Sequence, residues 1–276
     1  MISGEPLRVI TYLTPSIPER FFRAIADHLG RHLGRRAELQ VETRTSGPVL
    51  DDDPFELGEA DVGFMCAPSL VLLRAASSPS VELVPMAPVW ADERTEGRPV
   101  YFSDVVVRVD SGIDSFDRLR GRTWAYNDAR SLSGWHSALQ RLRAVPAGSE
   151  FFSSTVASGS HLESLRLVAG GRVDAAAIDS NVMALGRARH PEHAAGLRII
   201  ESWGPFPVQP AVVRASLPEE FKRQVASHLV DLHTGAEAAA LDGIPFERFA
   251  PITLDDYLSS PTVIEAARMV AEDVHH

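Results

Sequence analysis

Short apolar runs alternate with segments of helical periodicity along most of the chain. Leu7–Leu13 is apolar enough for a core strand, and apolar residues recur at helical spacing from Phe22 to Leu33. We expect further strands at 39–43, 61–65, 81–89, 101–109, 123–127, 150–154, 173–178 and 197–203, and further helices at 67–75, 113–121, 131–142, 160–169, 180–189, 217–232 and 261–274. Strands joined by helices predict an α/β fold with mostly parallel sheets that helices cover.

The first predicted helix carries an N-terminal capping pattern. Ser16 and Glu19 have the spacing of a capping box, and Pro18 suits the first helical turn. We therefore expect the Ser16 side chain to cap this helix.

Two loops that follow predicted strands combine hydroxyl side chains with a helix start. Ser131–Trp135 has the sequence SLSGW, and Ser158–His161 has the sequence SGSH. Function in open α/β sheets sits at the carboxyl ends of strands, and a helix N-terminus offers free N–H groups to an anion. The hydroxyls of Ser131 and Ser133 and the ring of His161 would add donors. Taken alone, the first loop is also compatible with a plain N-cap serine, and the second with a capping serine beside a surface histidine.

The charge balance and the single cysteine exclude several classes of protein. The 27 Lys and Arg residues against 37 Asp and Glu residues give a net charge of −10, which argues against nucleic-acid binding. No apolar run approaches the roughly 20 residues of a membrane span, so we expect no membrane insertion. Cys66 alone can form neither an internal disulfide nor a cysteine-based zinc site.

No residues are predicted to hold a metal ion. His28 and His32 stand four residues apart, but the glutamate of an H-E-x-x-H zinc motif is absent. We expect these histidines on a solvated helix face, and we expect no cofactor.

The first residues show neither the basic nor the apolar region of a signal peptide. We therefore expect one of two situations. Either the protein is cytoplasmic, or a signal sequence has been removed from a protein of the periplasm or cell surface.

Several segments together resemble one protein family. The SLSGW loop resembles an S-T-S-G-Y loop, and SGSH followed by GRVDAAAIDS at 171–180 resembles an S/T-G-S-H … G-K-V-D-A-G-A-V-D-S run. Weaker matches are GEADVGFM at 58–65, YFSDV at 101–105 and the opening strand at 7–15. These patterns are similar to those of the phosphate/phosphite/phosphonate-binding proteins of ABC importers. The resemblance covers about residues 7–214, and the run at 158–180 is its most specific part.

The resemblance implies a two-lobed type II periplasmic-binding-protein fold that closes on a small anionic ligand by hinge motion. It implies capture rather than catalysis, no cofactor, and an ABC permease as a partner. We expect lobe one at 1–108 plus 206–276 and lobe two at 109–205. Two crossing strands, near 105–109 and 199–203, would form the hinge.

The family's ligand contacts carry over onto the two loops and the predicted hinge. The serine hydroxyls of the two loops, the Gly134 amide and the His161 ring would bind phosphonyl-type oxygens. Tyr101 would reach the ligand from the hinge, and Asp179 would receive a cation such as an amine at the ligand's other end. The predicted ligand-binding residues are Tyr101, Ser131, Ser133, Gly134, Trp135, Ser158, His161 and Asp179.

One segment departs from the family pattern, and two other functions stay open. Residues 45–57 are acidic and lack the family's usual aromatic contact, for which Ser46 is the candidate replacement. Because fold does not fix function, a cytoplasmic enzyme of the lyase or dehydratase type is one alternative, with His161 and either Asp179 or Asp104 as its acid/base pair. A ligand-sensing protein is the other. A signal sequence or lipobox upstream in the gene would favour transport.

Overall fold

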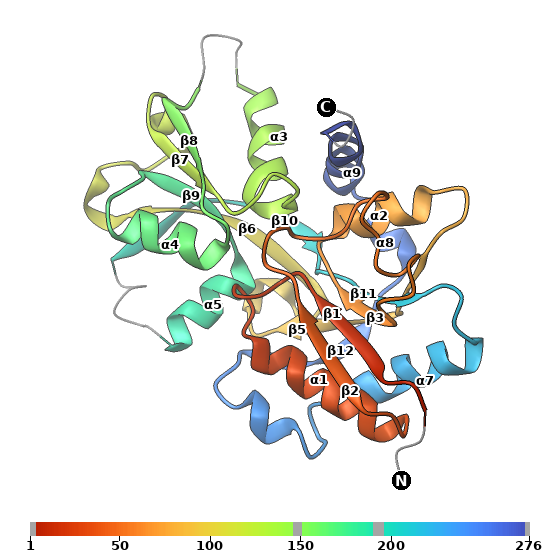
Figure 1. The fold of residues 1–276 in the computed structure, drawn as a ribbon. Helices are drawn as coiled ribbons and strands as arrows, with labels where there is room; N and C mark the ends of the chain where they lie inside the picture. The colour runs from red at the N-terminus through yellow and green to blue at the C-terminus, as the bar shows by residue number, and fades with distance from the viewer. Residues whose placement is uncertain (1–3, 146–150, 190–195, 274–276) are drawn as a thin grey trace.

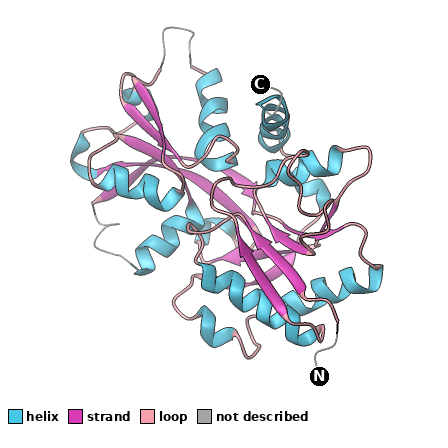
Figure 2. Cartoon of the chain, viewed as in Figure 1, coloured by secondary structure: helices cyan, strands magenta, loops and turns pink. Residues whose placement is uncertain are grey.

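The computed structural model describes residues 4–145, 151–189 and 196–273. The chain folds into two lobes, each built on a five-stranded sheet with helices beside it (Figures 1 and 2). A third, two-stranded sheet pairs β5 (Met86–Trp90) with β12 (Phe246–Pro251). The expected two-lobed α/β fold is therefore present.

The first lobe contains the sheet β2-β1-β3-β11-β4. Its strands are β1 (Leu7–Thr11), β2 (Ala37–Val41), β3 (Val62–Phe64), β4 (Val81–Leu83) and β11 (Ala211–Arg214). Its helices are α1 (Glu19–His32), α2 (Ala67–Ala75), α7 (Glu219–Val230), α8 (Leu254–Leu258) and α9 (Pro261–Asp273).

The second lobe contains the sheet β10-β6-β9-β7-β8. Its strands are β6 (Val100–Arg108), β7 (Thr123–Tyr126), β8 (Ser154–Ala157), β9 (Ala175–Asp179) and β10 (Leu197–Pro207). Its helices are α3 (Ser137–Arg143), α4 (His161–Ala169) and α5 (Ser180–Arg189), with a π-helical turn η4 (Leu132–His136) directly before α3.

Both large sheets are mixed, but four of the five strands in each run in one direction, as the predicted mostly parallel sheets require. In the first sheet β1 runs parallel to β2 and β3, whereas β11 is antiparallel to both of its neighbours. In the second sheet β7 runs parallel to β8 and β9, whereas β6 is antiparallel to β9 and β10. In each sheet one strand therefore runs against the other four: β11 in the first sheet and β6 in the second.

The two faces of β6 pack into two different cores. Val106 belongs to the large core that extends through both lobes, and Val105 and Val107 belong to a second core around Trp124 and Phe116. This division follows from the two-residue period of a strand, whose successive side chains point to opposite faces. β6 is thus buried on both sides, and it holds the two layers of the second lobe together.

Some predicted element boundaries were wrong. The predicted strand at 81–89 is two strands, β4 and β5, in different sheets. A strand was predicted at 150–154, but β8 begins at Ser154. Position 150 of the predicted range lies outside the described residues. β11 and β12 were not predicted: they lie in the C-terminal part of the chain, outside the helices predicted at 217–232 and 261–274.

Ser16 does not cap α1. The helix begins at Glu19, and its N-cap residue is Pro18, which has extended backbone angles and makes no side-chain capping bond. The Ser16 hydroxyl accepts a hydrogen bond from the His161 backbone N–H of the other lobe instead, at 3.1 Å. Because Pro18 fixes the helix start two residues later, Ser16 is left to make a contact between the lobes.

Candidate functional site

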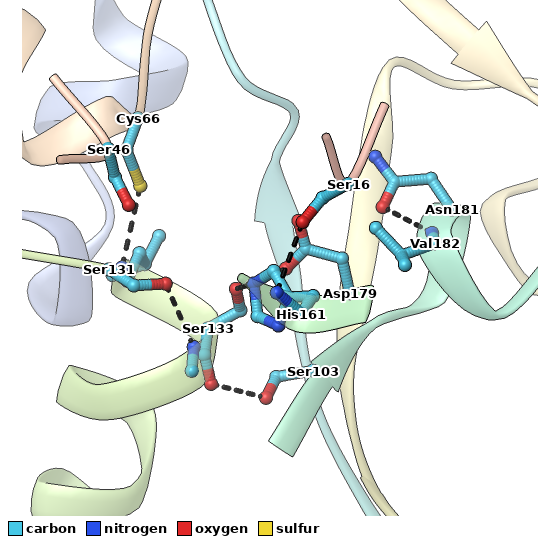
Figure 3. A network of polar contacts seen from close by, with 12 residues as sticks. Ser16, Ser46, Cys66, Ser103, Ser131, Ser133, His161, Asp179, Asn181 and Val182 are labelled. Atoms are coloured by element: carbon cyan, nitrogen blue, oxygen red, sulfur yellow. Dashed lines mark hydrogen bonds and ion pairs between the residues drawn. The ribbon is translucent and has the colours of Figure 1, made fainter. Parts of the chain in front are cut away.

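A small cavity of about 40 Å³ lies where the loops of the two lobes meet. Figure 3 shows several of its side chains pointing toward one another from both lobes. From the first lobe and the return segment it is lined by Tyr12, Ser16, Ser46, Cys66 and Gln209, and from the second lobe by Asn127, Asp128, Ser131, Ser133, His161 and Asp179. The predicted first-lobe candidate Ser46 and four of the predicted second-lobe residues are therefore brought together.

The loop after β7 presents its serines through the π-helical turn η4. The Ser131 side chain caps this turn by accepting a hydrogen bond from the Gly134 N–H at 3.1 Å. Ser133 is held by its carbonyl, which accepts from the hydroxyls of Ser103 at 2.8 Å and Ser137 at 2.6 Å. The Ser133 hydroxyl is left to face the cavity, and both serine side chains are buried.

Ser133, His161 and Gln209 all contact the Asp179 carboxylate in the cavity. The Ser133 hydroxyl donates to Asp179 Oδ1, and His161 Nε2 lies 3.2 Å from the same oxygen and 3.3 Å from Ser133 Oγ. Gln209 Nε2 donates to Asp179 Oδ2 at 2.7 Å. The strand β9 ends at Asp179, and α4 begins at His161, so both groups lie at the carboxyl end of the second sheet.

Hydrogen bonds across the cavity join the first lobe to the second. Ser46 donates to Asp128, and the Arg130 guanidinium donates to the Gly47 carbonyl at 3.2 Å. The Leu132 N–H lies 3.4 Å from Cys66 Sγ. The lobes are therefore in contact around the cavity rather than separated.

The Ser46 loop can reach the cavity because a glycine follows it. A Cβ at Gly47 would lie 2.3 Å from Ser69 Oγ in α2, and the Ser46 carbonyl accepts from the Cys66 N–H at 2.8 Å. The loop thus lies directly against the start of α2, and only glycine permits that approach.

The predicted residues Tyr101 and Gly134 do not line the cavity, but each lies next to residues that do. Burial raises the pKa of the Tyr101 hydroxyl well above its ordinary value, and the nearby Asp179 raises it further, so this phenol is a neutral donor. A Cβ at Gly134 would lie 1.8 Å from Asn127 Oδ1 and 3.1 Å from the His161 ring. Gly134 therefore lets the two loops of the second lobe approach each other.

Trp135 and Ser158 are the other two predicted residues that do not line the cavity. The Trp135 ring packs on Tyr126 with 4.3 Å between ring centroids. The Ser158 hydroxyl donates to the Tyr126 carbonyl at 3.1 Å and pairs with Ser164 Oγ at 2.7 Å, which holds the loop before α4. These contacts give both side chains a structural role.

The cavity is lined by acidic and neutral groups. Its described lining residues include Asp128 and Asp179 but no lysine or arginine. Burial raises the pKa of the Cys66 thiol to about 12, and burial together with Asp52 and Asp53 raises the pKa of Tyr12 above its ordinary value. The thiol and both phenols are therefore neutral at physiological pH.

Of the residues named for an enzyme, His161 and Asp179 are in contact at 3.2 Å, but with Ser133 they do not have the geometry of a hydrolytic triad. In a hydrolytic triad the carboxylate holds one ring nitrogen of histidine while serine meets the other. Here Ser133 and Asp179 both approach Nε2 of His161. Asp104 is absent from the cavity lining, because it forms a bidentate ion pair with Arg94 at 2.8 and 3.0 Å.

The cavity also contains residues that were not predicted, among them Gln209, Asn127 and Asp128. Asn127 ends a predicted strand and Asp128 follows it, and the end of a strand is a signal for a site in this kind of sheet. Gln209 follows β10 in the segment that returns to the first lobe, and no local pattern marks it.

Metal binding and membrane insertion are not indicated by the described part of the chain. Within residues 4–145, 151–189 and 196–273, no cluster of three or more candidate side chains could hold a metal ion. No described helix is long and apolar enough to cross a membrane. His28 is not on a solvated face as predicted but is buried, with Nδ1 2.9 Å from Glu237 and Nε2 2.8 Å from the His228 carbonyl.

Solved structures share this fold. A binding-protein component of an ABC phosphonate transporter from Pseudomonas aeruginosa is 19% identical, with a TM-score of 0.73 over 98% of this chain and 87% of that one. PhnD1 from Prochlorococcus marinus in complex with methylphosphonate is 17% identical, with a TM-score of 0.78 over 96% and 98%. XAC2383 from Xanthomonas citri is 18% identical, with a TM-score of 0.71 over 98% and 100%. At these identities the likeness establishes the two-lobed fold.

The sequence itself matches a family model. Residues 7–257 match the model described as "ABC transporter, phosphonate, periplasmic substrate-binding protein". The match includes both lobes and every residue of the cavity discussed above. The chain therefore belongs to the family of periplasmic substrate-binding proteins of phosphonate ABC transporters.

Proposed function

We propose that this protein captures a small phosphorus oxyanion, a phosphonate or a phosphate-like ion, in the cavity between its lobes. The observation that carries the proposal is the convergence of Ser131, Ser133 and His161 from the second lobe on Ser16 and Ser46 from the first. Hydroxyl and imidazole donors are suited to a tetrahedral oxyanion, and enclosing them between the lobes strengthens each hydrogen bond. A structural relative holds methylphosphonate.

The predicted site divides into contacting and supporting residues. Ser131, Ser133 and His161 would bind the oxyanion, and the Tyr101 hydroxyl would donate a hydrogen bond to it. Gly134 would supply space rather than an amide, since its N–H already bonds to Ser131. Ser158 and Trp135 would hold the loops in place.

The lobes would close on the ligand about the two crossing strands. Because β6 and β10 make their ladder hydrogen bonds within the second sheet, we place the lobe boundaries near residues 99 and 208. The predicted boundaries at 108 and 206 would divide β6 from its own sheet. Closure would exclude water from the oxyanion.

The partner would be an ABC permease, and the place of action the periplasm or the cell surface. Both follow from the family rather than from a contact in the structure. Fractionation of cells that express the intact gene would test the location, because a cytoplasmic product would contradict transport.

Isothermal titration tests the proposal directly. The ligands are phosphate, phosphite, methylphosphonate and 2-aminoethylphosphonate, with a dicarboxylate as the control. We expect one-to-one binding of at least one phosphorus oxyanion, weakened by about tenfold or more in Ser133→Ala, because a hydrogen bond to a charged group contributes about 1.5–3 kcal/mol.

Ser154→Ala is the matched control variant. It removes the same hydroxyl group from an exposed position in β8 of the same lobe, outside the cavity lining. Its affinity should stay within about threefold of the wild type. Equal losses in both variants, or no binding of any phosphorus oxyanion, would refute the proposed site.

A further inference from the structure

A second cavity, of about 470 Å³, lies between α4, α5 and the loop that precedes α1 (Figure 1). We call it the α4–α5 groove, and its walls include Leu162, Leu165 and Ala169 on α4 and Val182, Met183 and Gly186 on α5. Its volume is within the range of about 300–1,000 Å³ that is usual for small-molecule sites. Ser16 is the one described residue that lines both this groove and the cavity between the lobes.

The walls of the groove are apolar and partly uncovered. Leu162 and Leu165 are half-buried and Ala169 is exposed, although their spacing places all three on one face of α4. On α5, a Cβ built at Gly186 meets nothing within 4 Å, so the helix leaves open space there. Apolar surface uncovered in a hollow of this size is typical of a site that an apolar molecule fills.

The rim of the groove is positively charged. The charged side chains among its described lining residues are two arginines, Arg166 and Arg187. Arg187 is exposed and makes no ion pair or hydrogen bond within the described part of the chain. Arg166 lies 3.4 Å from Glu163, but Arg172 contacts the same carboxylate at 3.3 Å. The rim therefore carries excess positive charge, in a chain whose net charge is −10.

The groove is built from both lobes. Pro15, Ser16 and Pro18 line it from the first lobe, and α4 and α5 line it from the second. The Ser16 hydroxyl accepts a hydrogen bond from the His161 N–H at the start of α4, at 3.1 Å. A molecule in the groove would touch both lobes beside this contact, and it would favour the arrangement in which they stay together.

We propose that the α4–α5 groove binds a second ligand, a free monocarboxylate with a hydrocarbon chain. The chain lies against Leu162, Leu165 and Gly186, and the carboxylate pairs with Arg166 and Arg187. The site does not depend on the proposed function. Its consequence, tighter capture of the oxyanion when the groove is filled, rests on that function.

Titration calorimetry with decanoate, below the concentration at which it aggregates, is the first test. We expect one-to-one binding, and octanoate should bind about tenfold more weakly because two fewer methylene groups are buried. Decyltrimethylammonium has the same chain and the opposite charge, so it should bind at least about tenfold more weakly than decanoate. Equal affinities of the two decyl compounds would overturn the assignment of a carboxylate.

Gly186→Leu places a side chain in the groove itself. It should weaken decanoate by at least about tenfold, because the leucine occupies the space of several methylene groups. Ala188→Leu is the matched control, since it adds the same side chain at an exposed position of α5 outside the lining. Leucine is a good helix former, so we expect both variants to fold. Equal decanoate affinities in the two variants would overturn the proposed position.

Arg187→Gln tests the charge. It should weaken decanoate by about tenfold, the effect of losing one hydrogen bond to a charged group, and it should not weaken decyltrimethylammonium. Arg118→Gln makes the same change of net charge at a side chain that is 62% exposed and absent from the lining. This control should bind decanoate as the wild type does. A similar loss in both variants would reduce the effect to net charge and overturn the pairing with Arg187.

A second copy of the chain is the other occupant to be tested. Sedimentation velocity at several protein concentrations measures the oligomeric state. We expect a monomer whose groove is open to decanoate. A dimer that Gly186→Leu dissociates, together with no binding of decanoate to the wild type, would overturn the proposal.

The effect on oxyanion capture is measured separately. Saturating decanoate should tighten methylphosphonate by at least about fivefold, and methylphosphonate should tighten decanoate by the same factor, because such coupling is reciprocal. Decanoate binding without any coupling would refute the link to the lobes and retain the groove as a binding site. Tight methylphosphonate binding with no decanoate binding would overturn this inference and leave the proposed function intact. Decanoate binding with no phosphorus oxyanion bound would refute the proposed function alone.

Discussion

Gly134 is the residue at which the smallest change should have the largest effect on binding. Replacing it with alanine would force the new methyl group against Asn127 Oδ1, and the loop that carries Ser133 would have to move. We expect Gly134→Ala to weaken oxyanion binding by about tenfold or more, because that is the effect of losing one charge-assisted hydrogen bond. Titration calorimetry measures the affinity.

Gly186 in α5 provides the control, because a Cβ built there meets nothing within 4 Å. Gly186→Ala should leave binding unchanged and stabilise the protein by about 0.5–1 kcal/mol, since alanine is the better helix former. Equal affinities of the two variants would show that the close approach at Gly134 is unimportant.

Cys66 should report on access to the cavity. Burial raises the pKa of its thiol to about 12, so the reactive thiolate is scarce at pH 8 and increases only as the pH approaches that value. We expect slow alkylation by iodoacetamide at pH 8, slowed further by a bound oxyanion. Alkylation at the rate of an exposed thiol, with no effect of the ligand, would contradict this arrangement. Mass spectrometry follows the reaction.

The sequence could identify individual donors but not their partners. Ser131, Ser133 and His161 stand in recognisable loops at strand ends, and they line the cavity. Gln209 could not be found, because it reaches Asp179 only after the chain has crossed back between the lobes. Ser158 was predicted in the site because a serine that supports a loop and a serine that binds a ligand look alike in sequence.

At the scale of elements, the junction between β6 and β10 depends on one buried charge. Asp104 on β6 is fully buried, pairs with Arg94 at 2.8 and 3.0 Å, and accepts from Ser202 on β10 at 2.6 Å. The Arg94 guanidinium also stacks over Phe102 at 4.6 Å. This cluster fixes the segment that enters the second lobe.

Arg94→Ala should destabilise the protein by about 3 kcal/mol. This lies at the lower end of the range for a broken buried pair, because Arg94 is itself 40% exposed. Denaturant unfolding measures the change. Combining Arg94→Ala with Asp104→Asn should recover part of the loss, since the buried charge is then removed. A double variant less stable than the sum of the single effects would contradict the interpretation.

The pattern of elements was predictable where hydrophobic period and length agreed. α5 (Ser180–Arg189) has the predicted bounds, and α4 and α9 differ from theirs by one residue at one end. β11 and β12 were missed because each pairs with a strand that is distant in the sequence, β3 or β5. Such pairing gives no local period, so the mixed direction of the sheets could not be predicted either.

At the scale of the whole molecule, ligand binding should stabilise and compact the chain together. A ligand at 100 times its dissociation constant should add about 2.7 kcal/mol to the free energy of unfolding. Small-angle scattering should show a smaller radius of gyration in the same sample. His161→Ala should show neither effect at the same ligand concentration. Compaction of this variant would show that closure of the lobes does not depend on ligand binding at His161.

The ring of contacts between the lobes also sets how long a captured ion stays. Ser46 with Asp128 and Ser16 with His161 must separate before anything can leave. Release of every ligand then shares one upper limit, the rate at which the lobes part, however weakly the ion itself is held. In stopped-flow displacement, residence times of weak ligands should therefore converge on a common minimum, and Ser46→Ala should shorten it. A transporter that pulls the lobes apart would control delivery through this single step.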